Sequence, residues 1–321
     1  MITASQPPTQ RVDDLEAKLV RCLQISPRAR FKTLGEVLGT SEQTVARRYR
    51  KLVAAGAIRV RGYVPFDVRQ QDAWVVRLRC GVPAGDEVAD ELVARREARW
   101  VALCSGGTEI VSVLLSPHLG LEHATEPTPT VVGHALVLHT FTPQPHGAWA
   151  GLQDLLTDEQ EARVRDTSVT VTEIPATDDF DEHDAVLIDA LTGDGRTSVA
   201  ALAELSGLSE GRVSRRLETL LGSGLVGLRV DLSPRAFGAD SLAVLWLDVA
   251  PRHLDQVGRA LADERQVINV IALSGTWNLG VLMACTDAAA LYEFVVRTVG
   301  AHDAVRATEV SPVVRRVSAA S

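Results

Sequence analysis

The sequence predicts an α+β protein of two tandem units, each a winged helix-turn-helix followed by a ferredoxin-like βαββαβ module. Two observations support this fold class. A shift of 168 residues, with no gap, aligns one block of the chain with a second block that has the same pattern. In each block helical apolar periodicity is followed by strand-like alternation. Because an internal repeat sets the architecture, we expect two copies of one unit in the 321 residues.

The repeat is carried by apolar, glycine and paired arginine positions. Ser41, Glu42, Val45, Arg47, Arg48, Leu52 and Gly56 match Ser209, Glu210, Val213, Arg215, Arg216, Leu220 and Gly224; upstream, Leu19, Leu23, Arg28, Leu34, Glu36 and Gly39 match Leu187, Leu191, Arg196, Leu202, Glu204 and Gly207.

The first block predicts three short helices. Leucines recur every four residues from Leu15 to Leu23, and this helix is expected to end before Ser26 because Pro27 follows it. Thr33 is expected to cap a second helix, and Ser41 a third that runs to about Ala55. The alternating stretches 58–63 and 226–232 predict a strand or short wing after each third helix.

One side of each third helix is polar. Val45 and Leu52 are expected to face the other helices, which leaves the arginines on the outer face. The outer residues are Thr44, Arg47, Arg48 and Lys51 in the first copy and Arg212, Arg215, Arg216 and Thr219 in the second.

The second part of each repeat changes its period. In the first copy 73–80, 100–105, 109–116 and 135–142 predict strands and 86–94 a helix, while 118–126 fits neither type clearly. In the second copy 242–249, 252–263, 267–274, 279–285, 288–299 and 305–314 predict the order βαββαβ, which is the ferredoxin-like motif. Such a sheet packs one face on its helices, and the other face needs cover.

These segments define the expected domains. The helix-turn-helix domains are 11–65 and 181–232, the ferredoxin-like domains are 70–145 and 240–317, and 146–180 is a linker. Within the linker, Leu152, Leu155 and Leu156 followed by 157–160 suggest a short helix, and 175–181 is an acidic stretch.

Composition limits the classes of protein. No stretch reaches the roughly 18 apolar residues that span a bilayer, and the polar start of the chain suggests no leader, so we expect a cytoplasmic protein without membrane contact. The four cysteines lack metal or disulfide spacing. Five histidines between His118 and His146 share no helix face, so a metal site there is a minor alternative and we assign no metal or other cofactor.

Charge is unevenly distributed. The chain carries a net charge of -8, yet residues 14–61 hold eleven Lys/Arg and four Asp/Glu, a local charge of +7. The matching window, 182–229, has a local charge of -2. The first copy is therefore expected to bind phosphate more strongly than the second.

The whole pattern resembles the Lrp/AsnC, or feast/famine, transcription regulators, with the single unit of that family present twice. The resemblance rests on Leu202-Ala203-Glu204-Leu205, Gly207-Leu208-Ser209, Val213-Ser214-Arg215-Arg216, Ser274-Gly275-Thr276-Trp277-Asn278-Leu279 and Arg306-Ala307-Thr308-Glu309. It implies a sequence-specific regulator that binds double-stranded DNA and responds to a small metabolite such as an amino acid.

The third helices supply suitable chemistry for DNA. Arginine can donate two hydrogen bonds to guanine in the major groove, while hydroxyl, amide and ammonium groups hold phosphates. The DNA-binding candidates are Ser41, Gln43, Thr44, Arg47, Arg48 and Lys51, with Ser209, Arg212, Arg215 and Arg216 in the second copy. Whether the second copy reads a half-site or serves as scaffold stays open, because Glu218 and Thr219 replace Arg50 and Lys51.

The resemblance also places an effector beside a glycine turn at the interface of paired sheets. Asn278 stands where the family pattern has an acidic residue, so the carboxylate for an amine would be Glu109 in the first copy. The effector candidates are Gly106, Gly107, Glu109, Gly275, Thr276, Trp277 and Asn278; the alternative is that these turns and Trp277 have only structural roles.

Two other functions remain as alternatives. Fused sirohaem decarboxylases resemble the same family, but the glycine turns here have no neighbouring His or Arg, and no catalytic residues are assigned. The other alternative is a metabolite-sensing module that does not bind DNA. Pairing of the two sheet modules would give a pseudo-dimer, and we expect chains to form a homo-oligomer. The operator, the sign of regulation, the effector and the oligomer size are not determined by the sequence.

Overall fold

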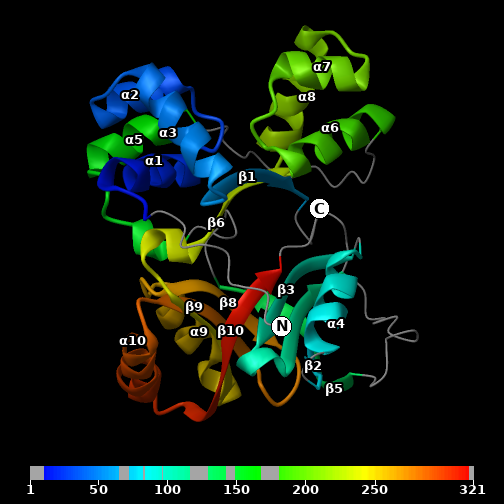
Figure 1. The fold of residues 1–321 in the computed structure, drawn as a ribbon, viewed down its shortest axis with the longest axis vertical. Helices are drawn as coiled ribbons and strands as arrows, with labels where there is room; N and C mark the ends of the chain where they lie inside the picture. Colours follow the sequence, from blue (N-terminus) through cyan, green and yellow to red (C-terminus); the bar gives the residue numbers. More distant parts are fainter. Residues whose placement is uncertain are drawn as a thin grey trace. The chain divides into compact units, whose positions relative to one another are not determined.

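The computed structural model describes residues 11–64, 72–81, 84–95, 97–115, 129–141, 149–167 and 181–317. The chain divides into two compact units. One contains both helix-turn-helix domains, at 1–69 and 144–238, and the other contains both sheet modules, at 70–143 and 239–321. Like domains are thus grouped together, although they are far apart in sequence (Figure 1). No helix in the described ranges has the length and apolar character needed to cross a membrane.

The first helix-turn-helix has the three expected helices. Asp13 forms a capping box with Glu16 at the start of α1, and the Ser41 side chain accepts a hydrogen bond from the backbone N–H of Thr44 at the start of α3. The expected cap at Thr33 is wrong, because α2 already begins at Phe31 and has no side-chain cap. The bounds are α1 Asp14–Ile25, α2 Phe31–Leu38 and α3 Glu42–Ala54.

The second helix-turn-helix repeats this plan. Asp181 and Asp184 form the capping box of its first helix, and Ser209 occupies the N-cap of its third. Leu187, Leu202 and Val213, one from each helix, are fully buried together in its core. The bounds are α6 Glu182–Gly193, α7 Val199–Ser206 and α8 Glu210–Gly222.

The strands that follow the third helices pair with each other rather than folding back as separate wings. β1 (Ile58–Tyr63) and β6 (Gly227–Leu232) form a two-stranded antiparallel ribbon. Arg61 lies opposite Arg229, its own equivalent in the repeat. A pseudo-two-fold axis therefore passes through the ribbon, as in an isologous dimer interface.

The predicted linker contains a helix that packs on the first copy, but this helix begins at Asp158, after the leucines at 152, 155 and 156 that suggested it. α5 (Asp158–Arg165) begins with a capping box of Thr157 and Gln160, and its Val164 is completely buried. Gln160 donates to the carbonyl of Val37, and Glu161 pairs with Arg21, so α5 contacts both α1 and α2 (Figure 1). The single-turn 3-10 helices of this unit are η2 Ala150–Leu152 and η3 Pro234–Phe237.

The second unit is a closed eight-stranded sheet in the order β10-β3-β4-β2-β5-β8-β9-β7. The first module contributes β2 Trp74–Arg79, α4 Ala84–Val93, β3 Ala98–Cys104, η1 Ser105–Gly107, β4 Glu109–Leu114 and β5 Thr130–Thr140. The second contributes β7 Ser241–Val249, η4 Pro251–His253, α9 Leu254–Ala262, β8 Val267–Leu273, β9 Leu279–Cys285, α10 Ala288–Glu293, a π turn η5 Phe294–Thr298, η6 Val299–Ala301 and β10 Val305–Val317.

The predicted order βαββαβ is confirmed for the second module. In the first module the expected elements are present, but the unassigned segment 118–126 lies outside the described residues. So do His118, His123 and His146 of the histidine group and 175–180 of the expected acidic linker.

The two modules are joined by equivalent strand pairs. The last strand of each module pairs with the second strand of the other, β10 with β3 and β5 with β8. Inside the closed sheet, where the two modules face each other, lies a shared apolar layer with residues from both modules, including Val75, Val111, Val244 and Trp246. The outer faces pack on α4 in the first module and on α9 and α10 in the second. The expected cover for each bare sheet face is thus the other module.

Candidate DNA interface and effector region

The outer face of α3 presents several of the predicted DNA-binding side chains. Gln43 and Arg47 are exposed, and Arg47 has no ion pair with any residue that the structure describes. The hydroxyl groups of Ser41 and Thr44 lie 2.9 Å apart at the beginning of the helix. In the second copy Arg212 and Arg215 are exposed on α8. Each third helix thus carries an exposed arginine at the same repeat position, Arg47 and Arg215.

The second arginine of each pair faces the first helix of its own domain. Arg48 pairs with Asp13, and its Nη1 lies 3.3 Å from Oε1 of Glu16, whose side chain is buried. Lys51 contacts the same oxygen of Glu16 at 2.8 Å. Two of the predicted DNA-binding cations in the first copy are therefore engaged by acidic residues of the α1 capping box.

The second copy repeats this arrangement. Arg216 pairs with Asp181, and its Nε donates to Oδ1 of Asp184 at 2.7 Å. The repeat matches Asp13 with Asp181, the buried Glu16 with Asp184, and Arg48 with Arg216. The same arginine therefore joins the third helix to the capping box of the first helix in both domains.

These ion pairs affect the titration of the capping acids. Burial raises the pKa of Asp13, but hydrogen bonds from Arg48 and from the backbone N–H of Glu16 outweigh it and hold the pKa below 3.8. The backbone N–H of Asp184, followed by Arg216, lowers the pKa of Asp181. Both acids are therefore ionised at neutral pH and hold their arginines.

Sequence reasoning treated both arginines of each pair as equal candidates for DNA contact. The sequence contains a signal that could distinguish the two arginines of each pair: the acids that form the capping boxes recur at the same 168-residue offset as the arginines. Only the packing of the third helix against the first shows that Arg48, and not Arg47, reaches these acids.

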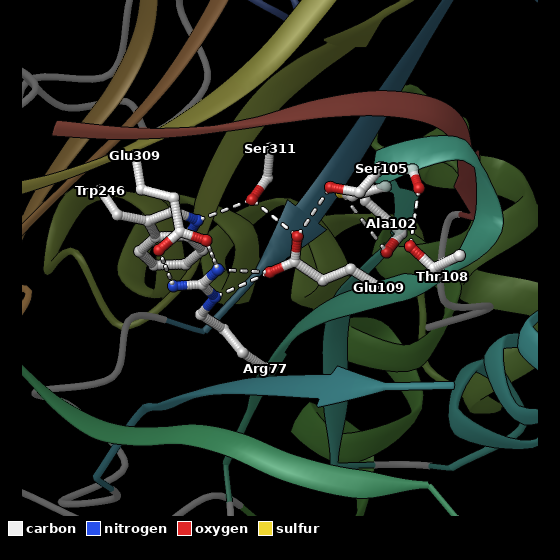
Figure 2. Close-up of polar contacts among 9 residues, drawn as sticks. Arg77, Ala102, Ser105, Thr108, Glu109, Trp246, Glu309 and Ser311 are labelled. Atoms are coloured by element: carbon white, nitrogen blue, oxygen red, sulfur yellow. Dashed lines mark hydrogen bonds and ion pairs between the residues drawn. The ribbon is translucent and has the colours of Figure 1, made fainter. Parts of the chain in front are cut away.

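The first glycine turn leads directly into a buried polar network between the two sheets (Figure 2). Glu109 is only 7% exposed. Its Oε1 accepts from Nε of Arg77 at 2.7 Å, and its Oε2 accepts from the hydroxyls of Ser105 at 2.9 Å and Ser311 at 2.7 Å. Both oxygens of the carboxylate predicted to hold an effector amine are thus occupied by side chains of this chain.

The network crosses from one module to the other. Arg77 of the first module also donates to Glu309 of the second, with Nη1 and Oε2 3.2 Å apart, and its guanidinium lies 4.4 Å from the ring centroid of Trp246. The Trp246 indole N–H donates to Ser311 at 3.0 Å. Burial lowers the pKa of Arg77, but the two carboxylates outweigh that effect and raise it. Arg77 therefore stays charged at the joint between the modules.

The second glycine turn is organised differently. Oδ1 of Asn278 accepts from the backbone N–H of Val249 at 2.9 Å, and its Nδ2 donates to the carbonyl of the same residue at 2.7 Å. Gly275 and Thr276 are exposed, and Trp277 packs against the layer between the sheets. A φ of +108° explains why glycine stands at position 275. Gly106 and Gly107 have positive φ for the same reason in the first turn.

The described acids and histidines form no group of three that could hold a metal ion. His118, His123 and His146 of the histidine group lie outside the described residues, so this statement does not include them.

Comparison with known families identifies both kinds of domain. The AsnC-type helix-turn-helix domain matches residues 12–53 and 180–221, and the Lrp/AsnC ligand binding domain matches residues 242–321. The ligand-binding match falls on the second sheet module.

Several proteins named as transcriptional regulators are similar to part of the chain. The proline dehydrogenase transcriptional activator of Rhizobium radiobacter is 31% identical over 32% of this chain and 68% of its own length. The HTH-type transcriptional regulator LrpA of Pyrococcus abyssi is 26% identical over 42% of this chain and 94% of its own. The regulatory protein AsnC of Escherichia coli K12 is 25% identical over 40% and 87%, respectively. In each case less than half of this chain matches most of the length of the relative.

Solved structures of a siroheme decarboxylase are similar over nearly the whole of this chain. The siroheme decarboxylase NirDL has a TM-score of 0.60 with 14% sequence identity, and the match covers 95% of this chain and 92% of that one. At this identity the likeness shows the fold alone. The two helix-turn-helix matches, the ligand-binding domain match and the relatives identify the chain as a member of the Lrp/AsnC family of transcriptional regulators, with the family unit in duplicate.

Proposed function

We propose that α3 and α8 are a pair of recognition helices that read two half-sites of one operator, with Arg47 and Arg215 as the base-reading residues. The observation that supports this assignment most strongly is their equivalence. Both arginines are exposed, both lie one turn into a helix with serine at the N-cap position, and a pseudo-two-fold axis relates their domains. Two-fold related recognition helices suit a palindromic operator.

The remaining polar groups are assigned to the phosphate backbone. Ser41, Gln43 and Thr44 lie at the start of the helix that carries Arg47, and Ser209 and Arg212 lie at the start of the helix that carries Arg215. Helix N-termini and hydroxyl groups bind phosphate and fix the register without reading sequence. Arg48 and Arg216 act through their ion pairs and hold each recognition helix against the first helix of its domain.

The experiment is selection of genomic fragments by the purified protein, followed by gel shift of the best fragment over a salt series. Arg47→Ala and Arg215→Ala are expected to lose sequence preference, with about 1–3 kcal/mol less discrimination for each contacted guanine. Arg297→Ala removes one positive charge from an exposed site in the sheet unit and serves as the matched control. Absence of any enriched fragment, or unchanged preference in Arg47→Ala, would contradict the assignment.

We propose that a small-molecule effector, such as an amino acid, binds beside the second glycine turn rather than at Glu109. The ligand-binding family match covers this module, Thr276 is exposed, and Trp277 borders the layer between the sheets. Glu109 is assigned instead to the joint between the modules, because its two oxygens already accept three hydrogen bonds.

A thermal-shift screen of the twenty amino acids tests the effector site. A ligand that stabilises the protein by mass action should lose its effect in Thr276→Ala. Thr108→Ala, at the exposed threonine of the first turn, is the control and should keep the effect. If the ligand-induced thermal shift is lost in Thr108→Ala but kept in Thr276→Ala, the effector site lies in the first module.

We propose that the chain regulates and does not catalyse, in line with the named functions of its sequence relatives. Within the described residues, the charged groups at the sheet interface, Arg77, Glu109 and Glu309, are paired with one another. Titration of the purified protein with sirohaem, followed by absorbance, is expected to show no shift of the tetrapyrrole absorption bands. A saturable shift with loss of a carboxyl group from the tetrapyrrole would support the decarboxylase alternative instead.

A further inference from the structure

A pair of equivalent arginines connects the two helix-turn-helix domains. Arg28 follows α1, and its Nη1 and Nη2 donate to the carbonyls of Gly195 at 2.7 Å and Thr197 at 2.9 Å. Arg196 follows α6, and its Nη1 and Nη2 donate to the carbonyls of Pro27 at 2.6 Å and Ala29 at 3.0 Å. Each arginine thus bridges two carbonyls that flank the other.

This contact has the symmetry of the repeat. Arg28 and Arg196 differ by 168 positions, and their acceptors differ by the same offset in the opposite direction. The contact is therefore isologous about the axis that passes between Arg61 and Arg229 in the β1–β6 ribbon. It joins the loop between the first two helices of one domain to the same loop of the other.

The arginines are partly buried and specifically held. Burial lowers the pKa of both Arg28 and Arg196. The Arg196 guanidinium also lies 4.5 Å from the ring centroid of Phe31, at the start of α2, and 5.2 Å from that of Tyr49, on α3. Hydrogen bonds from a charged donor are stronger than neutral ones, and a planar fork that bridges two carbonyls fixes direction as well as distance. Arg196 therefore links its own domain directly to the recognition helix of the other.

The ribbon alone is a weak connection. A two-stranded sheet has marginal stability, and its twist varies widely. The backbone at Gly195 packs closely against Val60 of the ribbon. A Cβ at position 195 would lie 2.9 Å from Cγ1 of Val60, and the Gly195 backbone N–H donates a hydrogen bond to the carbonyl of Val60 at 2.9 Å. The two helix-turn-helix domains are thus joined in two places. One is the β1–β6 ribbon, and the other is the pair of loops that Arg28 and Arg196 connect.

We propose that Arg28 and Arg196 are positioning residues that fix the separation of α3 and α8, and thereby set the half-site spacing that one chain accepts. This inference rests on the proposed function, since it concerns the distance between the two recognition helices. The arginine pair, here called the reciprocal clamp, contacts no DNA in this role. It determines which half-site spacing is bound, because it allows only one arrangement of the two helix-turn-helix domains.

The first test is a spacing series. The selected operator is changed by half a helical turn, about five base pairs, which moves one half-site to the other side of the duplex. The wild type is expected to bind the altered operator at least about 30-fold more weakly, since a misplaced half-site loses its base contacts. The Arg28→Ala/Arg196→Ala variant is expected to reduce this ratio to below about threefold, because each domain can then reorient. Arg235→Ala, which removes an exposed charge from the same unit, should retain the wild-type ratio.

The second test measures the separation without DNA. Glu42→Cys and Glu210→Cys place spin labels at equivalent exposed positions that begin α3 and α8. The native thiols are buried, and burial raises the pKa of Cys22 and Cys104 to about 12 and that of Cys80 and Cys285 as well, so labelling is selective. Electron-electron distance measurement is expected to give one narrow distribution with the clamp intact and a broad one in Arg28→Ala/Arg196→Ala.

The outcomes separate the two proposals. If the wild type binds no DNA specifically, the proposed function fails, whatever the spin-label distances are. The other outcome is that the wild type binds one spacing, and the double variant keeps both that preference and a narrow distribution of spin-label distances. In that case the proposed recognition helices are supported, but the proposed role of the reciprocal clamp is overturned. Far-ultraviolet circular dichroism of the double variant, compared with the wild type, verifies that both domains remain folded in these measurements.

Discussion

At the scale of single residues, neighbouring arginines of one helix have opposite environments. Arg47 is exposed, whereas Arg48 is held by Asp13 and the buried Glu16. We expect Arg48→Ala to lower the free energy of unfolding by about 1–3 kcal/mol, because it removes a charged partner from a buried carboxylate. Arg47→Ala should change it by less than about 0.5 kcal/mol. Urea denaturation of both variants measures the difference.

The second copy supplies the control for this prediction. Arg216→Ala should destabilise the protein and Arg215→Ala should not, since the same capping acids hold Arg216. Equal stability loss in all four variants would show that the exposed arginines also carry structural contacts. Equal stability of Arg48→Ala and Arg47→Ala would show that Lys51 alone satisfies Glu16.

The network at the sheet joint supports a second residue-scale prediction. Glu109→Gln keeps the size of the side chain but removes the charge that faces Arg77. We expect a loss of about 2–4 kcal/mol in the free energy of unfolding, because loss of one partner from a buried ion pair leaves the other charge poorly compensated. A double-mutant cycle with Arg77→Met measures the coupling. A coupling energy of zero would mean that Glu309 alone holds Arg77.

These residues also show where sequence reasoning reached its limit. Periodicity correctly separated the buried face of α3 from its outer face, since Val45 and Leu52 are buried. Periodicity describes one helix, however, and could not show that Arg48 lies beside α1. Glu109 was identified as a notable carboxylate, but its three donors come from different strands and a turn, including Ser311 of the other module.

At the scale of elements, α5 distinguishes the two copies. It covers α1 and α2 of the first helix-turn-helix, with Val164 completely buried. We expect Val164→Ala to cost about 1–3 kcal/mol through loss of buried methyl groups and the resulting cavity. Hydrogen exchange should then show faster opening of α1 and α2, with no change in α6 and α7. Unchanged exchange in the first copy would show that α5 adds no stability to it.

The capping boxes give a pH-dependent prediction for the helical elements. The pKa of Asp13 is lower in the folded protein than its usual 3.8. The stabilisation from this acid is therefore fully present above about pH 4 and is lost as the pH falls through the lower folded-state value. Because Arg48 is a main cause of that lowering, the stability difference between wild type and Arg48→Ala should shrink below about pH 4. Urea midpoints at several pH values measure it, and a constant difference would contradict the ion pair.

Local sequence signals predicted most elements but not their partners. Proline after Ser26 and serine at 41 marked real helix ends, and α1 and α3 have the expected bounds within a residue or two. Thr33 was misleading because α2 starts at Phe31, whose ring lies 5.3 Å from that of Tyr49 in a tertiary contact that local capping preferences do not include. The strands after the third helices were expected as wings, and their alternation could not reveal that they pair with each other.

At the scale of the whole molecule, the duplication turns what would be contacts between chains into contacts within one chain. In the helical unit these contacts are the β1–β6 ribbon and the reciprocal clamp. In the sheet unit they are the β10–β3 and β5–β8 pairs, which close all eight strands into one sheet. The repeat predicted a pseudo-dimer of sheet modules, but the closure of the sheet depends on register across the modules, which no single segment encodes.

This arrangement leads to a prediction of stoichiometry. The two proposed recognition helices, α3 and α8, belong to one chain and are related by a pseudo-two-fold axis, so one chain should occupy an operator with two half-sites. Native mass spectrometry of the complex with a short duplex that contains one operator is expected to give a ratio of one chain to one duplex. A higher assembly, which the duplicated plan also allows, should require a longer duplex with further half-sites. Two chains on the short duplex would instead mean that each chain reads with only one helix, and the acidic surroundings of α8 would then identify Arg47 as the reader.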